Sequence, residues 1–304
     1  MPVRIVFPTE TVLSEAAERL RAGELVAFPT ETVYGLGANA LDANAVGKIF
    51  TAKGRPASNP LIVHVASESA ARNLAASWPE SAEQLAATYW PGPLTLVVEK
   101  TEGIPEIVTA GGSTVGLRVP AHPVALELLK ACGLPLAAPS ANRSEETSPT
   151  TAQHVADSLG PYVDDLLIID GGPCQVGIES TVVDVTGPTP IVLRPGMISL
   201  ETAISANANT SDASISRSPG QMLRHYAPRK PFIIIQSAQD QFSLMPTDGL
   251  LRLTGNPEEA ARRLYAELRR LDTLEYITRI VVLAPPDTAE WAAIHDRLRR
   301  AAAS

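Results

Sequence analysis

Short apolar runs alternate with amphipathic segments along most of the chain. The runs have the length of buried strands and lie at residues 25–28, 60–65, 94–99, 114–119, 134–140, 165–170, 180–185 and 190–195. Between them, apolar positions recur at helical spacing in residues 11–22, 42–52, 68–76, 81–89, 123–131 and 150–159. Strands mixed with helices, some neighbouring strands being joined by short turns, predict an α/β domain with a mixed sheet.

The composition changes after residue 198. Residues 199–217 are poor in large apolar side chains and rich in Ser, Ala, Asn and Thr, which predicts a linker. Beyond it, a strand at 231–236, a helix opened by Asn256-Pro257, a strand at 277–284 and a last helix predict a second, smaller α/β domain. We therefore expect a catalytic domain over 1–198, a linker over 199–229 and a small C-terminal domain over 230–304.

The composition is that of an ordinary globular protein. The 304 residues, 45% of them hydrophobic, suffice for one large or two ordinary domains with apolar cores. No apolar run approaches the roughly 20 residues of a membrane span, and the N-terminus lacks the pattern of a signal peptide. We expect a cytoplasmic protein without membrane contact. The two cysteines, Cys132 and Cys174, suggest reduced thiols rather than a disulfide framework.

The net charge of −8 is unevenly distributed. Acidic residues outnumber basic ones in residues 1–228, whereas the two are nearly balanced in residues 229–304. A broad basic face for duplex nucleic acid is therefore not apparent. In that acidic background, a cation beside a glycine or proline becomes a candidate for a local anion site.

The segment FPTETVYGLGANA, residues 28–40, contains the G-x-G-x-x-A pattern of a dinucleotide-binding turn. In such folds the glycines open a helix at once, and an acidic residue follows about 20 positions later. Here the next helix is expected near Asp42, and position 55 is an arginine. This context argues against a nicotinamide or flavin site, and no P-loop motif is present. The polar turn Thr30-Glu31-Thr32 suits a small polar ligand; alternatively, the glycines only permit a tight turn.

Polar and cationic side chains follow several of the expected strands. Lys53 and Arg55 lie on a loop that Pro56 and Pro60 stiffen, and His64 ends the next strand. Because ligands in α/β folds collect at strand ends, we expect one combined site. Its anion holders would be Lys53, Arg55, Arg118 and Arg194, and its neutral hydrogen-bonding groups Thr32, Ser140, Asn142 and Ser180. These groups suit a nucleotide together with a small carboxylate.

Several ordered fragments between about Leu25 and Pro228 resemble the YrdC-like family of threonylcarbamoyl-AMP synthases. They are FPTETVYGLGANA, KGRPxxxPLIVH, WPGPLTLVV, GLRVPAHP, APSANxS, ESTVVD and LRPG. SPGQMLRHYAP is similar to the linker of the family's long form, which carries an extra C-terminal domain. The resemblance implies a twisted mixed sheet flanked by helices around a concave basic cavity.

The resemblance also implies an activity. The family is a group of nucleotidyltransferases that combine L-threonine, bicarbonate or CO2, and ATP into threonylcarbamoyl-AMP and release pyrophosphate. Mg2+ would accompany ATP as the cofactor. A separate transferase would pass the threonylcarbamoyl group to a tRNA adenosine, and a weak direct contact with tRNA is conceivable.

Position within these motifs implies the residue roles. Threonine would bind to Thr32, Tyr34, His64, Arg118 and Ser180. ATP would bind to Lys53, Arg55, Asn59, Thr114, Ser140, Asn142, Arg194 and Tyr226, with Lys53 and Arg55 as the catalytic cations. Arg224, His225 and Tyr226 would belong to a lid formed by the linker. Glu31 and Glu179 either bind Mg2+ or accept backbone hydrogen bonds, so the metal ligands stay open.

The chain departs from the family pattern after Asn142. It reads Arg143-Ser144-Glu145, where family members commonly have a glycine after the serine, so the shape of this turn stays open. One alternative function is an RNA-binding module that uses the same concave surface. A second, the carbamoyl-transfer domain of hydrogenase maturation, requires zinc-finger cysteines that two isolated cysteines cannot supply.

Overall fold

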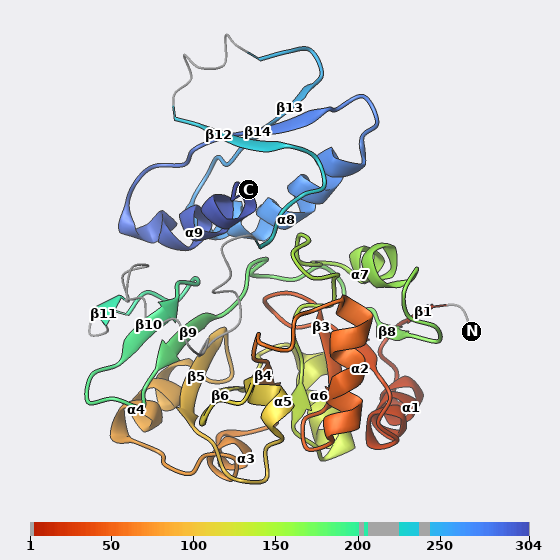
Figure 1. Ribbon diagram of the computed structural model, residues 1–304, viewed down its shortest axis with the longest axis vertical. Coiled ribbons are helices and arrows are strands. Elements are labelled where there is room, and N and C mark those ends of the chain that lie inside the picture. Colours follow the sequence, from red (N-terminus) through yellow and green to blue (C-terminus); the bar gives the residue numbers. More distant parts are fainter. Residues whose placement is uncertain (1–2, 201–203, 206–224, 237–243, 304) are drawn as a thin grey trace.

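The computed structural model describes residues 3–200, 204–205, 225–236 and 244–303, which form two sheets of unequal size (Figure 1). The larger sheet has eleven strands in the order β1-β8-β2-β3-β7-β4-β6-β5-β9-β10-β11. They are β1 (Arg4–Val6), β2 (Val26–Phe28), β3 (Gly35–Asn39), β4 (Ile62–His64), β5 (Leu94–Glu99), β6 (Thr114–Arg118), β7 (Leu136–Ala137), β8 (Leu167–Ile169), β9 (Thr181–Asp184), β10 (Ile191–Arg194) and β11 (Ile204–Ser205). Parallel and antiparallel pairs both occur, which confirms the predicted mixed sheet.

Seven helices flank this sheet in the described part of the chain. They are α1 (Glu10–Arg21), α2 (Ala43–Lys53), α3 (Glu68–Arg72), α4 (Glu80–Tyr89), α5 (Glu106–Thr109), α6 (Pro123–Cys132) and α7 (Ala152–Leu159). Local chemistry sets the limits of α2: the Asp42 carboxylate accepts from the first backbone amides, and Gly54 ends the helix in the left-handed region at φ 58°. This C-cap fixes where the chain turns between Lys53 and Arg55.

Two apolar layers cover the faces of the large sheet. One contains Leu20, Phe28 and Leu128 and packs α1 and α6 against β2, β7 and β8. The other contains Ile49 and Leu96 and packs α2 among others. The alternative in which the glycines only permit a tight turn is wrong, because Gly35 and Gly37 belong to strand β3 itself. A Cβ at Gly37 would stand 2.8 Å from the Phe28 ring, so close strand packing requires this glycine.

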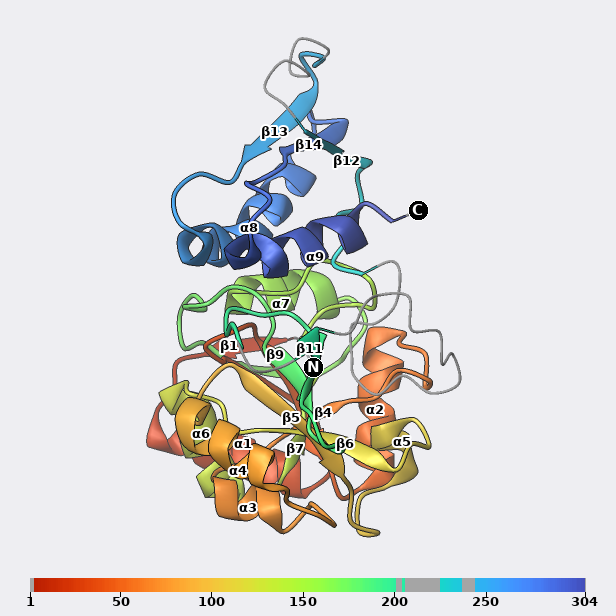
Figure 2. The same ribbon diagram turned by 90° about the vertical axis from the view of Figure 1, so that its left-hand side faces the viewer.

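The C-terminal part forms the predicted second, smaller α/β domain. It contains β12 (Phe232–Ile235), β13 (Asp248–Arg252), β14 (Arg279–Leu283), α8 (Pro257–Thr273), the 3-10 helix η2 (Ala289–Trp291) and α9 (Ala292–Ala301). Its three strands are parallel, in the order β12-β14-β13. Figures 1 and 2 show α8 and α9 between this small sheet and the larger domain. Its apolar core includes Val33 and Ile178 of the larger domain, so the two domains share buried contacts.

The exact domain limits predicted above stay a prediction. Both cysteines, Cys132 and Cys174, are buried free thiols. Among the helices of the described ranges, none is both long and apolar enough to cross a membrane.

Candidate functional site

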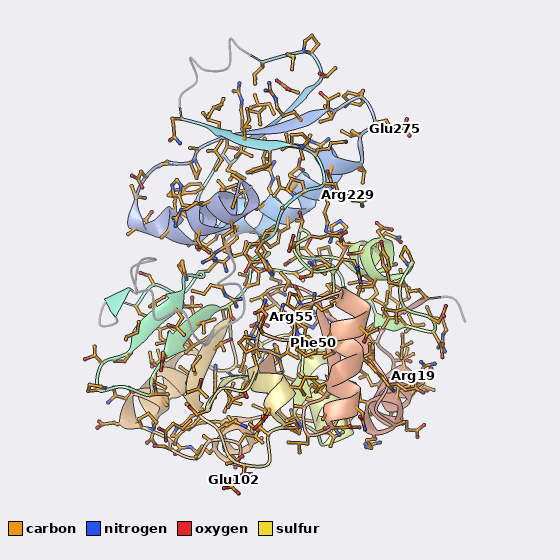
Figure 3. The ribbon with its side chains drawn as sticks, in the orientation of Figure 1. Arg19, Phe50, Arg55, Glu102, Arg229 and Glu275 are labelled. Carbon is orange, nitrogen blue, oxygen red and sulfur yellow. The ribbon has the colours of Figure 1, made fainter. Side chains whose placement is uncertain are left out.

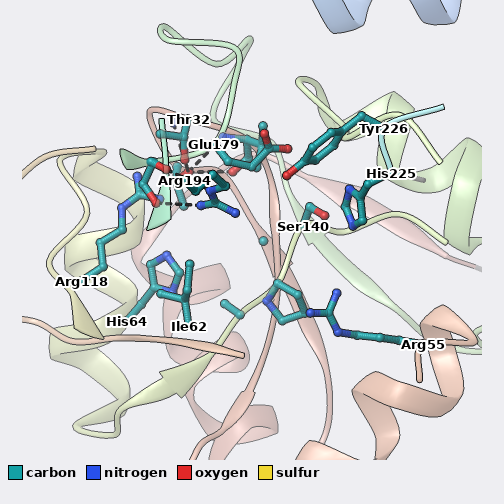
Figure 4. Close-up of a pocket in the computed structure, with 16 residues that line it drawn as sticks. Thr32, Arg55, Ile62, His64, Arg118, Ser140, Glu179, Arg194, His225 and Tyr226 are labelled. Carbon is teal, nitrogen blue, oxygen red and sulfur yellow. Dashed lines mark hydrogen bonds between the residues drawn. The ribbon is translucent and has the colours of Figure 1, made fainter. Parts of the chain in front are cut away.

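A cavity lies across the face of β4, close to the contact between the two domains (Figure 4). It is lined by Thr30, Thr32, Val33, Gly35, Arg55, Ile62, His64, Arg118, Ala138, Pro139, Ser140, Glu179, Ser180, Arg194, His225 and Tyr226. Water-sized molecules can occupy about 50 Å³ of this cavity. This volume holds only a few waters.

The direction of β7 explains why the cavity covers a face rather than one edge of the sheet. β7 runs antiparallel to β4, so the loop that carries Ser140 returns beside Ile62, and Ala138 N donates to Ile62 O at 3.0 Å. His64 is two residues further along β4 and therefore points to the same face as Ile62. His64 and Arg118 end the parallel strands β4 and β6, and Ser140 follows the end of the antiparallel strand β7, so all three lie at strand ends as expected.

Arg118 and His64 form one side of the cavity. They are paired across β6 and β4 in the strand register, and both are buried. Arg118 Nη2 donates to Glu31 Oε1 at 2.6 Å, and Nε donates to Gly92 O at 3.3 Å. Burial, together with the charge of Arg118, lowers the pKa of His64 well below its ordinary value. The imidazole is therefore neutral near pH 7.

Hydroxyl groups surround this side of the cavity. Thr32 Oγ1 lies 2.8 Å from Thr30 Oγ1. Ser180 Oγ lies 2.8 Å from Thr95 Oγ1 and accepts from Arg194 Nη2 at 3.0 Å. Burial lowers the pKa of Arg194, which is fully enclosed, yet its guanidinium keeps the Ser180 hydroxyl and carbonyl as partners. Arg194 thus connects the predicted threonine residues to the predicted ATP residues.

Both candidate carboxylates are already occupied by protein groups. Besides Arg118, Glu31 accepts from Ala121 N at Oε2, 3.0 Å away. Glu179 Oε1 accepts from Ser148 Oγ at 2.6 Å, and Oε2 accepts from Tyr265 Oη at 2.9 Å and Arg297 Nε at 3.1 Å. The residues that the structure describes contain no cluster of three or more His, Cys, Asp or Glu side chains that could hold a metal ion.

Arg55 and Ser140 lie opposite Arg118 and His64 in Figure 4. Arg55 donates to Asn59 O at 3.2 Å and Pro60 O at 2.9 Å, and Figure 3 shows it within the larger domain. Burial is the main cause that lowers the pKa of Arg55 to about 10, and the nearby Arg194 charge acts in the same direction. The side chain therefore remains a cation at neutral pH.

Lys53 stands behind the wall of the cavity rather than on its surface. Its Nζ donates to Ser140 O at 2.6 Å and to Asn142 O, and Asn142 in turn donates to Glu146 O at 2.8 Å. Burial, and next the Arg55 charge, lowers the pKa of Lys53 well below its ordinary value. Lys53 therefore organises the Ser140 loop, and its contact with ATP stays a prediction, as does that of Asn59 and Asn142.

Two further residues that were predicted to bind substrates, Tyr34 and Thr114, do not line the cavity. The Tyr34 hydroxyl donates instead to the segment after β8, to Gly172 O at 2.8 Å and Asp170 Oδ1 at 3.2 Å. Thr114 is not among the residues that line the cavity either, and its contact with ATP stays a prediction. It begins β6 whereas Arg118 ends it, so the two are about 13 Å apart along the strand.

The linker contributes His225 and Tyr226 to the cavity, whereas Arg224 lies outside the described residues. The Tyr226 ring stacks on Tyr265 of α8, with 5.7 Å between ring centroids. The Tyr226 hydroxyl is buried and has no hydrogen-bond partner among the described residues. A buried hydroxyl of this kind is available to a ligand in the cavity.

The turn after Asn142 keeps the shape that a glycine would favour. Glu145 adopts the left-handed conformation at φ 69°, and its carbonyl accepts from Ala227 N at 2.8 Å. Glu145, where family members commonly have a glycine, therefore adopts a backbone conformation that favours glycine. This turn also ties the Ser140 loop to the linker.

Four residues that support the site were not among the predicted ones: Thr95, Ser148, Tyr265 and Arg297. Thr95 lies inside the fragment WPGPLTLVV, which contains the signal that could have found it. Arg297 and Tyr265 are 118 and 86 positions from their partner Glu179, and no local pattern marks them.

Comparisons with known proteins give a consistent result. Residues 18–196 match the Sua5/YciO/YrdC family, described as "Telomere recombination", and residues 196–303 match "Threonylcarbamoyl-AMP synthase, C-terminal domain". The chain is 41% identical to the threonylcarbamoyl-AMP synthase of Pyrococcus abyssi, over 94% of this chain and 92% of that protein. It is 40% identical to the Bacillus subtilis protein of the same name, over 95% and 92% of the two chains.

Solved structures agree with these sequence matches. The crystal structure of P. abyssi Sua5 complexed with L-threonine superimposes with a TM-score of 0.91 at 38% identity, covering 99% of this chain and 98% of that one. Full-length HypF in a phosphate- and nucleotide-bound form gives a TM-score of 0.52 at 20% identity, which shows a shared fold alone.

Proposed function

The chain belongs to the Sua5/YciO/YrdC family, and we propose that it is a threonylcarbamoyl-AMP synthase that supplies tRNA threonylcarbamoyladenosine modification. The enzyme joins L-threonine, bicarbonate or CO2, and ATP into threonylcarbamoyl-AMP by nucleotidyl transfer. One observation carries the proposal: the same cavity is lined by Arg118, suited to a carboxylate, and by Arg55 and Arg194, suited to phosphates.

Threonine would bind on the Arg118 side. The guanidinium is already oriented by Glu31 and Gly92, so it meets the amino acid's carboxylate with little loss of side-chain freedom. The Thr32 and Ser180 hydroxyls would bind the polar atoms of the substrate. Neutral His64 would orient the amine or the carbamate without adding a competing positive charge.

The reaction needs positioning more than a protein nucleophile. Once the threonine amine has captured CO2, a carbamate oxygen attacks the α-phosphorus of ATP. The new O–P bond forms as the bond between the α-phosphorus and the bridging oxygen breaks, and pyrophosphate leaves. Negative charge develops on the phosphates, and the buried cations Arg55 and Arg194 would stabilise it in a site of low dielectric.

Mg2+ would enter with ATP as part of the substrate. Both oxygens of Glu31 and of Glu179 are bonded to protein donors, so these carboxylates do not fit a protein-held metal centre. We therefore assign no metal ligand to the described residues.

The linker would exclude water from the product. A mixed anhydride such as threonylcarbamoyl-AMP hydrolyses readily, and the linker residues His225 and Tyr226, which line the cavity, would help to cover it. Opening would release the product to a tRNA threonylcarbamoyl transferase. A cytoplasmic location and any direct contact with tRNA stay predictions.

Pyrophosphate release by the purified protein tests the function. ATP, L-threonine and bicarbonate are supplied together, and each is omitted in turn, with Arg118→Ala and Arg55→Ala measured alongside. We expect release only when all three are present, and its loss in both variants. Release that ignores threonine, or no release together with tight RNA binding, would contradict the synthase and favour the RNA-binding alternative.

A further inference from the structure

Arg297, on α9 of the C-terminal domain, reaches into the larger domain beside the cavity. Its side chain is only 1% exposed. Nε donates to Glu179 Oε2 at 3.1 Å, Nη2 donates to Glu179 O at 3.2 Å, and Nη1 donates to Pro195 O. One guanidinium therefore binds two separate loops of the other domain.

These two loops carry cavity residues. Glu179 precedes Ser180, and Pro195 follows Arg194; Ser180 and Arg194 are hydrogen-bonded to each other. Both loops lie at the same end of the antiparallel pair β9 and β10. The packing there is close, since a Cβ at Gly196 would stand 2.4 Å from Thr181 N. Small movements at this end therefore displace Ser180 and Arg194 together.

A second residue of the C-terminal domain acts on the same carboxylate. Tyr265 of α8 donates its hydroxyl to Glu179 Oε2 at 2.9 Å, and its ring stacks on Tyr226 of the linker. Arg297 also lies over the Tyr226 ring, 5.6 Å from its centroid. Glu179 is thus held from α8 and α9, and the same two side chains border a linker residue that lines the cavity.

We propose that Arg297, assisted by Tyr265, is a positioning residue of the synthase: through Glu179 and Pro195 it holds Ser180 and Arg194 where threonine and ATP require them. The inference rests on the proposed function and extends it, because it makes the small C-terminal domain a part of the active site's framework. Arg297 touches no substrate in this scheme. Its contribution is the geometry of residues that do.

The charge balance of the network agrees with this role. Burial alone would raise the pKa of Glu179, but the charges of Arg297 and Arg194 and the Ser148 hydroxyl lower it below its ordinary value. The carboxylate is therefore ionised at neutral pH, and each of its oxygens accepts from at least one neighbouring donor. A smaller side chain at position 297 would leave the Glu179 and Pro195 oxygens without one of their donors.

Kinetics of Arg297→Lys and Arg297→Met test the proposal, with Arg299→Lys and Arg299→Met on the exposed face of α9 as matched controls. Melting temperatures identify the folded variants. In folded Arg297 variants we expect kcat/KM to fall about tenfold for both threonine and ATP, because small displacements of binding groups are costly in rate. The Arg299 variants should stay within about twofold of the wild type.

Tyr265→Phe provides a second variant that keeps the ring and removes only the hydroxyl bond to Glu179. We expect kcat/KM for threonine to fall about threefold. Unchanged kinetics in folded Arg297→Lys, or in Tyr265→Phe if the Arg297 variants do not fold, would overturn the proposal. An inactive wild-type protein would instead refute the proposed function, so the two failures are distinguishable.

Discussion

Arg118 and Glu31 form a buried ion pair at the side of the cavity where we propose that threonine binds, with 2.6 Å between Nη2 and Oε1. Their side chains are 4% and 6% exposed. Because Glu31 also accepts from Ala121 N, it is fixed in place and in turn fixes the guanidinium. The pair therefore sets the orientation of Arg118 before a substrate binds.

We expect Arg118→Gln to lower kcat/KM for threonine about a hundredfold, because a charge-assisted contact with the substrate carboxylate is lost. The same change leaves Glu31 buried without its cation, so the free energy of unfolding should fall by about 3 kcal/mol. Pyrophosphate-release kinetics and urea unfolding measure the two effects.

The double variant Arg118→Gln/Glu31→Gln separates these effects. It removes both charges, so it should recover most of the lost stability while threonine use stays impaired. If the double variant regained normal kinetics for threonine, Arg118 would act only as the partner of Glu31 and not as the carboxylate-binding group.

Arg55→Ala tests the phosphate side of the cavity. Removing this buried cation should lower kcat about a hundredfold, a loss of roughly 3 kcal/mol of transition-state stabilisation. Lys130→Ala, at an exposed position near the end of α6, provides the control for loss of one positive charge. Equal rates for the two variants would show that Arg55 does not stabilise the phosphates.

Local sequence patterns predicted much of the fold. The elements that they did not predict were missed for physical reasons. The helix over 11–22 and the one near Asp42 were predicted because apolar spacing, caps and a terminal glycine agree. β3 was missed because GLGAN lacks β-branched and aromatic residues; its Gly37 is required by the Phe28 ring, a tertiary contact. The sequence around β13 likewise gave no prediction of a strand.

The candidate site, too, was predicted only in part from the sequence. The motifs identified Arg55, His64, Arg118, Ser140, Ser180, Arg194, His225 and Tyr226, which the structure places around one cavity. Thr114, which the motifs also named, begins the strand that Arg118 ends, and its role stays a prediction. Arg297 could not be found, because its contacts depend on how the two domains pack.

Stability should depend on pH through buried histidines. Burial, and next the charge of Arg118, lowers the pKa of His64, and burial together with Arg55 lowers that of His225. As the pH falls, these histidines therefore bind protons first in the unfolded chain, near the ordinary histidine pKa of about 6.5. Stability is therefore unaffected above about pH 7 and falls as the pH drops below 6.5, by up to about 1.4 kcal/mol per pH unit for each histidine.

Urea unfolding between about pH 5 and pH 8 measures this slope. His64→Gln should flatten it, whereas His295→Gln on α9 provides the control for loss of an imidazole. The lowered pKa of Glu179 acts in a separate range, because its stabilisation is lost only as the pH falls below about 4.5. Equal stability of the wild type at about pH 5.5 and 7.5 would contradict the buried, neutral state of these histidines.

Glu145→Gly should stabilise the protein. Glu145 is exposed and holds φ at 69°, where a side chain costs about 1–2 kcal/mol and glycine costs nothing. Glycine also gains freedom in the unfolded chain, worth about 0.5–1 kcal/mol in the opposite direction. We therefore expect the free energy of unfolding to rise by about 0.5–1 kcal/mol, measured by urea unfolding near neutral pH.

The matched control is Glu127→Gly on α6, an exposed glutamate within a helix, where glycine should instead destabilise by about 1 kcal/mol. Glu145→Gly keeps the carbonyl that accepts from Ala227 N, so the linker should stay in place and kcat should not change. A fall in kcat without loss of stability would mean that the strained turn itself holds Tyr226 over the cavity. The backbone conformation at Glu145, rather than its hydrogen bond alone, would then control closure.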